Sequence, residues 1–70
     1  MFDYSNLYGL MAQKGVTRKM LAEKIGMARP YFCTILRQGN PMTSDVVYRI
    51  ANALGIDSTE IGFYFFVLKV

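Results

Sequence analysis

The residues of this chain best suited to chemistry are arginines that lie close to hydroxyl and amide side chains. Arg18 directly follows Thr17, while Arg37 lies three residues after Thr34 and three before Asn40. Guanidinium groups pair with phosphate oxygens or with guanine edges, and threonine hydroxyls reach both bases and phosphates. These residue types therefore favour recognition of a nucleic acid over the making or breaking of bonds.

Residues that could support catalysis or bind a metal are scarce. The 70 residues contain no histidine and one cysteine, Cys33. A zinc site has almost no ligands to draw on, and a cysteine–histidine nucleophile pair cannot form. A single cysteine also makes no internal disulfide, which fits a reducing cytosol. We therefore expect no metal, no cofactor and no enzymatic activity.

The charge and hydropathy of the chain point to one small domain. Eight Lys and Arg residues outweigh five Asp and Glu residues, for a net charge of +3. This mild excess permits a nucleic-acid partner. The N-terminal residues lack the pattern of a signal peptide, and the longest apolar run falls short of the roughly 20 residues that span a bilayer. We predict a single domain over residues 1–70 in the cytosol of a bacterial host, with no membrane association.

Glycines and an Asn-Pro pair divide the chain into five segments of helical length. Thr17 is a suitable N-cap for the second segment, and Asp57 has capping-box spacing to Glu60 in the fifth. Asp3 or Ser5 is predicted to cap the first. The predicted helices cover residues 4–14, 18–25 and 30–38, a segment that begins after Thr43 or Ser44 and ends at Gly55, and a segment that begins at Asp57.

The second and third predicted helices form a helix-turn-helix. A glycine just past a helix favours the left-handed conformation that turns the chain sharply, and Gly26 occupies that position. An apolar stripe with helical spacing lies on each side of this glycine. The two stripes are Leu21, Ala22 and Ile25 before it, and Phe32, Ile35 and Leu36 after it.

This scaffold resembles the phage repressor and Cro family of helix-turn-helix domains, the XRE-like proteins. The residues that carry the resemblance are L-A-E-K-I-G (Leu21–Gly26), Phe32, Ile35, Asn40-Pro41 and R-I-A-N-A-L-G-I (Arg49–Ile56). The ending I-G-F-Y-F-F resembles small proteins of Gram-positive phages in this group. The resemblance implies an all-α fold, a lambda-repressor-like five-helix bundle. It also implies binding to double-stranded operator DNA as a homodimer, with the third helix in the major groove.

The resemblance places base-facing and phosphate-facing residues on the second and third helices. Arg29, Pro30 and Thr34 match base-facing positions. Arg18, Arg37 and Asn40 match phosphate-facing positions, and the start of the second helix offers free N–H groups to a phosphate. The predicted DNA-binding residues are Thr17, Arg18, Lys19, Arg29, Pro30, Tyr31, Thr34, Arg37 and Asn40.

The third helix departs from the family pattern. Ala28, Pro30 and Cys33 occupy positions where polar side chains are usual, and Cys33 is predicted to face outward. Proline disfavours helical geometry at the residue before it, so the helix is predicted to begin at Pro30 with Arg29 extended outside it. The base-reading face is therefore poor in polar groups.

The C-terminal residues are apolar on every side, and two conformations stay open for them. They continue the fifth helix, or residues 66–70 form a short strand. Left exposed, such a segment favours association. The predicted dimer interface consists of Phe63, Phe66, Val67 and Leu68.

Two functions follow from these observations. The first is a Cro-like transcriptional regulator that occupies operator DNA as a dimer, because no second domain for oligomerisation and cleavage is evident. The second is an antirepressor or modulator that binds a phage repressor protein in place of DNA. An antitoxin is a further regulator that fits the pattern, and activation is not distinguished from repression.

Overall fold

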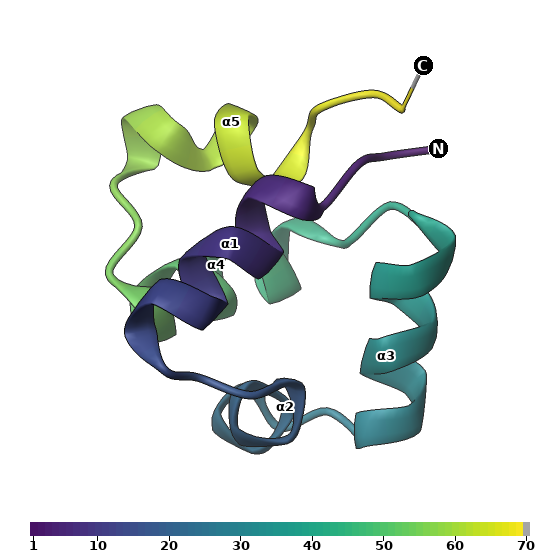
Figure 1. Cartoon of the computed structure of the whole chain (residues 1–70), viewed down its shortest axis with the longest axis vertical. Coiled ribbons are helices and arrows are strands. Elements are labelled where there is room, and N and C mark those ends of the chain that lie inside the picture. The colour runs from purple at the N-terminus through teal and green to yellow at the C-terminus, as the bar shows by residue number, and fades with distance from the viewer. Residues whose placement is uncertain (70) are drawn as a thin grey trace.

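The chain folds into a bundle of short helices in a computed structural model, which describes residues 1–69 (Figure 1). This part of the chain is all-α and contains no sheet, which confirms the predicted fold class. The elements are α1 (Ser5–Lys14), α2 (Arg18–Ile25), α3 (Arg29–Gln38), α4 (Ser44–Leu54), a 3₁₀ turn η1 (Ser58–Glu60) and α5 (Ile61–Phe65).

Side-chain caps begin α2 and α4 where the sequence predicts them. The Thr17 hydroxyl accepts a hydrogen bond from the Met20 N–H at 3.1 Å, and the Thr43 hydroxyl accepts one from the Val46 N–H at 3.4 Å. Each bond satisfies a first-turn N–H group that has no partner within the helix. Gly26 ends α2 with φ of +74°, a conformation that glycine adopts without strain. The helix-turn-helix is therefore confirmed in its local geometry.

The predicted apolar stripes meet in a single core. Leu7, Leu21, Phe32 and Ile50 have no exposed surface, and Phe65 from α5 is 1% exposed. Figure 1 shows α2 end-on while α3 lies in the plane of the view, so the two helices cross steeply. All six residues of the two predicted stripes are buried.

The prediction that α3 begins at Pro30 is wrong by one residue. The helix begins at Arg29, and Ala28 is the extended residue before it, with φ of −65° and ψ of +131°. Proline is tolerated in the first turn because its missing N–H would have no helical partner there. Arg29 therefore extends from the helix itself, on its first turn.

Two other helix starts use different hydrogen bonds from those expected. The Asp3 carboxylate accepts a hydrogen bond from the Ser5 N–H at 2.9 Å, immediately before α1. Asp57 forms no capping box, because its carboxylate accepts hydrogen bonds from the hydroxyls of Ser58 and Thr59 instead. This local arrangement yields the 3₁₀ turn η1 before α5.

The two ends of the chain lie side by side (Figure 1) and are joined by backbone hydrogen bonds. Phe2 and Leu68 form an isolated antiparallel bridge. The Asp3 N–H donates to the Val67 carbonyl at 2.7 Å, and the Lys69 N–H donates to the Met1 carbonyl at 2.9 Å. The C-terminal strand alternative is thus realised as a single bridge within residues 66–69, and Val70 lies outside the described residues.

Across residues 1–69, every helix is too short or too polar to cross a membrane. The same residues bring together no group of three or more His, Cys, Asp or Glu side chains that could hold a metal ion.

Candidate nucleic-acid interface

The outward face of α3 carries cationic and aromatic side chains on a helix without acidic residues. Arg29, Tyr31 and Arg37 are exposed, and Tyr31 has 63% of its surface accessible. Phe32, Ile35 and Leu36 on the opposite face hold the helix against the core. This amphipathic arrangement presents the outward side chains to any molecule that approaches α3.

Thr34 and Pro30 are linked within α3. The Thr34 hydroxyl donates a hydrogen bond to the Pro30 carbonyl oxygen at 2.9 Å, four residues earlier. A hydroxyl keeps acceptor capacity after donating its proton, so Thr34 can still accept a hydrogen bond. Its methyl group can also contact a thymine methyl. Pro30 is exposed beside it and adds only an apolar surface.

The first turn of α2 combines positive side chains with the positive end of a helix. Arg18 and Lys19 are both exposed, and Thr17 uses its hydroxyl to cap the Met20 N–H. The remaining first-turn N–H groups have no partner within the helix. Together with the helix dipole, they favour an anion at this position.

Asn40 lies in the loop after α3 and is held by its backbone. Its N–H donates to the Ile35 carbonyl at 3.1 Å, and its carbonyl accepts a hydrogen bond from the buried Tyr4 hydroxyl. The Asn40 side-chain amide donates to the Gln38 side chain at 3.2 Å. The loop is thus fixed to the end of α3 and to the residue before α1.

Tyr8, which is not among the predicted DNA-binding residues, lies beside one of them, Arg18. The Arg18 guanidinium carbon is 5.7 Å from the centre of the Tyr8 ring, within the range of a cation–π contact. Tyr8 also lines a groove of about 420 Å³ between α1 and α3, here called the α1–α3 groove. The lining of this groove includes Asp3, Ser5, Tyr8, Arg37, Gln38 and Lys69. In the sequence, Tyr8 belongs to no motif and so carries no signal for this role.

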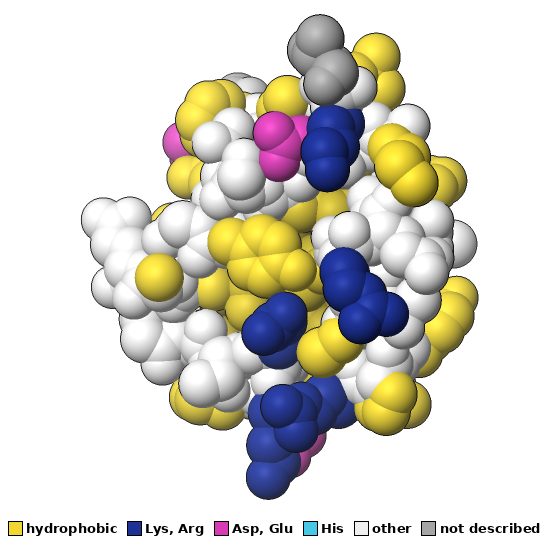
Figure 2. Space-filling model, turned by 45° about the vertical axis from the view of Figure 1, so that its right-hand side comes forward, with side chains coloured by type: hydrophobic (Ala, Val, Ile, Leu, Met, Phe, Trp, Pro, Cys, Tyr) yellow, Lys and Arg dark blue, Asp and Glu magenta, His cyan; other side chains and the backbone are white. Residues whose placement is uncertain are grey.

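The charged side chains of this surface are mostly positive. Figure 2 brings the side of the molecule that carries α3 forward and shows dark-blue side chains around a yellow apolar area, with few magenta ones nearby. Within the described residues, Asp3 is the acidic side chain that lines the α1–α3 groove. The Ser5 backbone N–H holds the pKa of its carboxyl below the usual range, because the hydrogen bond favours the charged form. Asp3 thus directs its charge to the start of α1.

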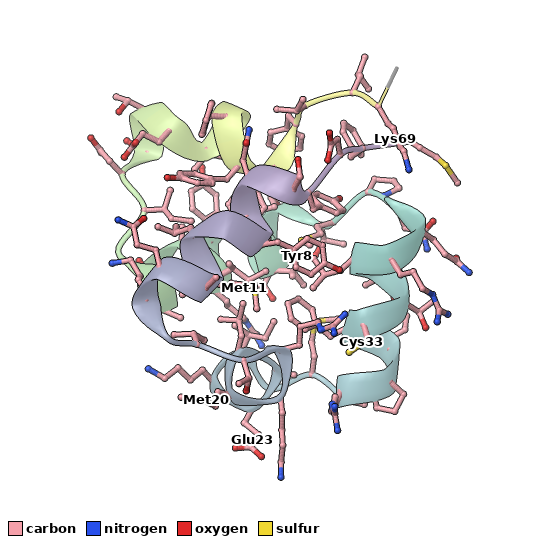
Figure 3. All side chains as sticks on the ribbon, in the orientation of Figure 1. Tyr8, Met11, Met20, Glu23, Cys33 and Lys69 are labelled. Carbon is pink, nitrogen blue, oxygen red and sulfur yellow. The ribbon has the colours of Figure 1, made fainter. Side chains whose placement is uncertain are left out.

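Cys33 lies partly inside the molecule, so the prediction that it faces outward is wrong. It is half-buried, and its side chain lies on the side of α3 toward α1 and α2 (Figure 3). The helical period places position 33 at the border between the apolar and outward faces of α3. At such a border, the exposure of the side chain depends on the angle at which the neighbouring helices cross.

The residues predicted to form a dimer interface lie together near the C-terminus and stay largely accessible. Phe63, Phe66 and Leu68 are 57%, 48% and 66% exposed, and Val67 is half-buried. The Phe66 ring packs edge-on against Phe2, with 5.9 Å between ring centres. This contact covers Phe66 in part and leaves Phe63 open.

Taken together, the steeply crossed α2 and α3 and the cationic surface define a helix-turn-helix DNA-binding domain. Residues 6–62 match the family described as the Cro/C1-type HTH DNA-binding domain, so the chain belongs to that family. The matched range contains α1 from its second residue, the whole of α2, α3 and α4, and the beginning of α5. A DNA-binding regulator is the function class that this membership supports. Among curated proteins, no significant match to the chain was found.

Proposed function

We propose that this chain is a sequence-specific, Cro-like transcriptional regulator that binds operator DNA as a dimer, with α3 in the major groove. The observation that carries the proposal is the cationic surface made by α3 and the first turn of α2. Four exposed cations, Arg18, Lys19, Arg29 and Arg37, lie there, and α3 contains no carboxylate.

The nine predicted residues divide between two tasks in this proposal. Arg29, Pro30, Tyr31 and Thr34 lie on the first half of α3 and would face base edges. The remaining residues surround them and would contact phosphates, which set the register of the protein on the duplex. They are Thr17, Arg18, Lys19, Arg37 and Asn40.

Regulation would follow from occupancy of the operator. Two subunits related by a twofold axis would cover half-sites about 34 Å apart, one helical turn of DNA. A dimer on such a site excludes other proteins from the same stretch of duplex. The exposed Phe63, Phe66 and Leu68 motivate a subunit contact near the C-terminus.

A salt titration of binding tests the proposal. The protein alone is mixed with a labelled duplex taken from the promoter next to its gene, and the affinity is measured by fluorescence anisotropy. If each subunit neutralises four phosphates, log K should fall with log salt at a slope of about −7 for the dimer. A slope near zero, or no binding at low salt, would overturn DNA binding.

The antirepressor hypothesis predicts a different result in the same experiment. An antirepressor gives no shift of the duplex by itself and changes the shift produced by the phage repressor protein. The mass of the chain in sedimentation, measured with and without the duplex, also distinguishes a DNA-bound dimer from a complex with another protein.

A further inference from the structure

Tyr8 is the residue that the described linings of two surface grooves have in common. One is the α1–α3 groove, which also contains Arg37. The other, of about 310 Å³, lies between α1 and the start of α2 and contains Thr17 and Arg18. Tyr8 is half-buried, and it points from α1 toward α3 (Figure 3). Tyr8 therefore shares one groove with Arg37 of α3 and the other with Arg18 of α2.

The charges around Tyr8 favour an anion. Arg18 lies over the ring at 5.7 Å, while Arg37 and Lys69 contribute to the α1–α3 groove. Among residues 1–69, the carboxylate that lines this groove is Asp3, and it accepts a hydrogen bond from the Ser5 N–H, which compensates part of its charge. The unpaired first-turn N–H groups of α2 add positive potential on the Arg18 side.

The phenol itself is available as a donor. Among the hydrogen bonds formed within residues 1–69, none involves the Tyr8 hydroxyl. A half-buried tyrosine keeps its polar end toward water or a ligand, and its ring packs against the protein. Tyr8 thus combines a ring packed against the core with an O–H group that forms no hydrogen bond within residues 1–69, beside two grooves that contain Arg18 and Arg37.

We infer that Tyr8 is a DNA-contact residue on α1 and that its hydroxyl donates to one backbone phosphate held between Arg18 and Arg37. The ring also positions Arg18 by lying under its guanidinium group. This inference rests on the proposed function and adds α1 to the two helices that meet DNA. Because a phosphate contact is independent of sequence, Tyr8 would strengthen binding to every duplex alike.

Tyr8→Phe tests the inference, because it removes the hydroxyl and keeps the ring over which Arg18 lies. The affinity should fall about fivefold on operator and unrelated duplexes alike, as expected for a partly exposed hydrogen bond to a charged group. The salt slope should not change, because a neutral side chain releases no counterion. Tyr48→Phe is the matched control, since Tyr48 is an exposed tyrosine on α4 that lines neither groove.

A scan with methylphosphonate linkages locates the contact. Each linkage replaces one charged phosphate oxygen of the duplex with a methyl group. At one position per half-site, the substitution should weaken the wild-type protein more than Tyr8→Phe, because the variant has already lost that contact. Equal sensitivity of the two proteins at every linkage would overturn the inference.

The failure of this inference is distinguishable from the failure of the proposed function. If the wild-type protein binds DNA with a steep salt slope and Tyr8→Phe binds as tightly, the proposed regulator function is retained and the proposed Tyr8 contact is rejected. If the wild-type protein binds no duplex, the proposed function fails first. Thermal unfolding of both variants, which should match the wild-type midpoint, separates a lost contact from a lost fold.

Discussion

A guanidinium nitrogen of Arg49, in α4, donates a hydrogen bond to the backbone carbonyl of Ile25, the last residue of α2, at 2.9 Å. The last carbonyls of a helix have no partner within it and form the negative end of the helix dipole. The Arg49 guanidinium at the end of α2 satisfies one of these carbonyl groups. Arg49 also lies 3.1 Å from the Asp45 carboxylate, so its side chain joins α4 to the turn of the helix-turn-helix.

Replacing Arg49 with methionine should destabilise the domain by about 1 kcal/mol. The substitution keeps an apolar stem and removes the donor to the Ile25 carbonyl. Because the Arg49 side chain is half-exposed, water can partly replace the lost hydrogen bond, which keeps the cost small. Urea unfolding followed by circular dichroism measures the change. Asp45→Asn is the control, since an exposed i,i+4 ion pair contributes about 0.5 kcal/mol or less. Equal losses in the two variants would show that the ion pair, and not the carbonyl contact, stabilises the turn.

Gly39→Ala should be far more destabilising than Gly55→Ala. Both glycines end a helix with φ of +69°, so both substitutions carry the same backbone strain of about 1 kcal/mol. A Cβ atom at Gly39 would collide with the Phe2 carbonyl oxygen, whereas one at Gly55 meets nothing within 4 Å. Relieving the collision requires the N-terminal segment to move away. That movement also breaks the hydrogen bond that the Phe2 N–H donates to the Gly39 carbonyl. Comparable unfolding midpoints would contradict the docked position of Phe2.

Tyr4→Phe should change how stability depends on alkaline pH. Burial raises the pKa of the Tyr4 phenol above its ordinary value of 10.0, because the charged form loses solvation. The unfolded chain therefore loses this proton at a lower pH than the folded chain, and wild-type stability falls as the pH rises through 10 and beyond. Below that range the variant should be about 1 kcal/mol less stable, because the hydrogen bond to Asn40 is lost.

The measurement for Tyr4 is urea unfolding of both proteins from pH 7 to pH 11. The difference in unfolding free energy between them should shrink above pH 10. The other four tyrosines are common to both proteins, so their titration cancels in the difference. A difference that stays constant to pH 11 would contradict a raised Tyr4 pKa.

Arg29 and Arg37 should affect DNA binding in different ways. Arg29 begins α3 and is proposed to face base edges, so Arg29→Ala should cost about 1–3 kcal/mol on the operator and relax sequence preference. Arg37→Ala should weaken binding to all duplexes and reduce the salt slope by about one per subunit. Anisotropy titrations on operator and shuffled duplexes at several salt concentrations separate the two. Lys14→Ala, at the exposed end of α1, is the charge-matched control.

Polar substitution of Phe63 and Phe66 together should lower the tendency of the chain to dimerise. The two rings are about half exposed, so Phe63→Ser with Phe66→Ser removes apolar surface that a partner subunit would cover. Sedimentation should shift toward the mass of a monomer, while circular dichroism keeps its helical signal. Tyr48→Ser is the matched control on α4. A double variant that stays dimeric would exclude this patch as the interface.

The sequence predicts most of the fold because its signals are local. Thr17 and Gly26 bound α2 by themselves, and the predicted range of residues 18–25 is the observed one. The predicted start of α3 is one residue late because a residue before proline usually disfavours helical geometry. In the first turn of a helix proline is tolerated, and Arg29 is helical there. Asp57 was misassigned because its carboxylate had nearer hydroxyl donors than the N–H group three residues on.

The candidate site also combines residues with local sequence signals and residues that only tertiary contacts reveal. Arg18 and Arg37 were selected from the sequence because their positions match a motif, although their contacts with DNA stay predictions. Tyr8 could not be selected, because its significance comes from α2 and α3 and not from its neighbours in the chain. Phe66 is predicted to lie in the dimer interface, which stays a prediction. Its packing against Phe2 joins opposite ends of the chain, and no periodicity reveals it.

By itself, the sequence determined where the helices lie, the hydroxyl caps of α2 and α4 and the apolar stripes that are buried, since spacing, glycines and hydroxyl caps act within a few residues. Only the tertiary structure decided which side chains meet. It put Arg18 over Tyr8, the Tyr4 hydroxyl on the Asn40 carbonyl and Phe2 beside Leu68. These contacts depend on the angles at which helices cross and on the path of the chain ends, which result from packing the whole core.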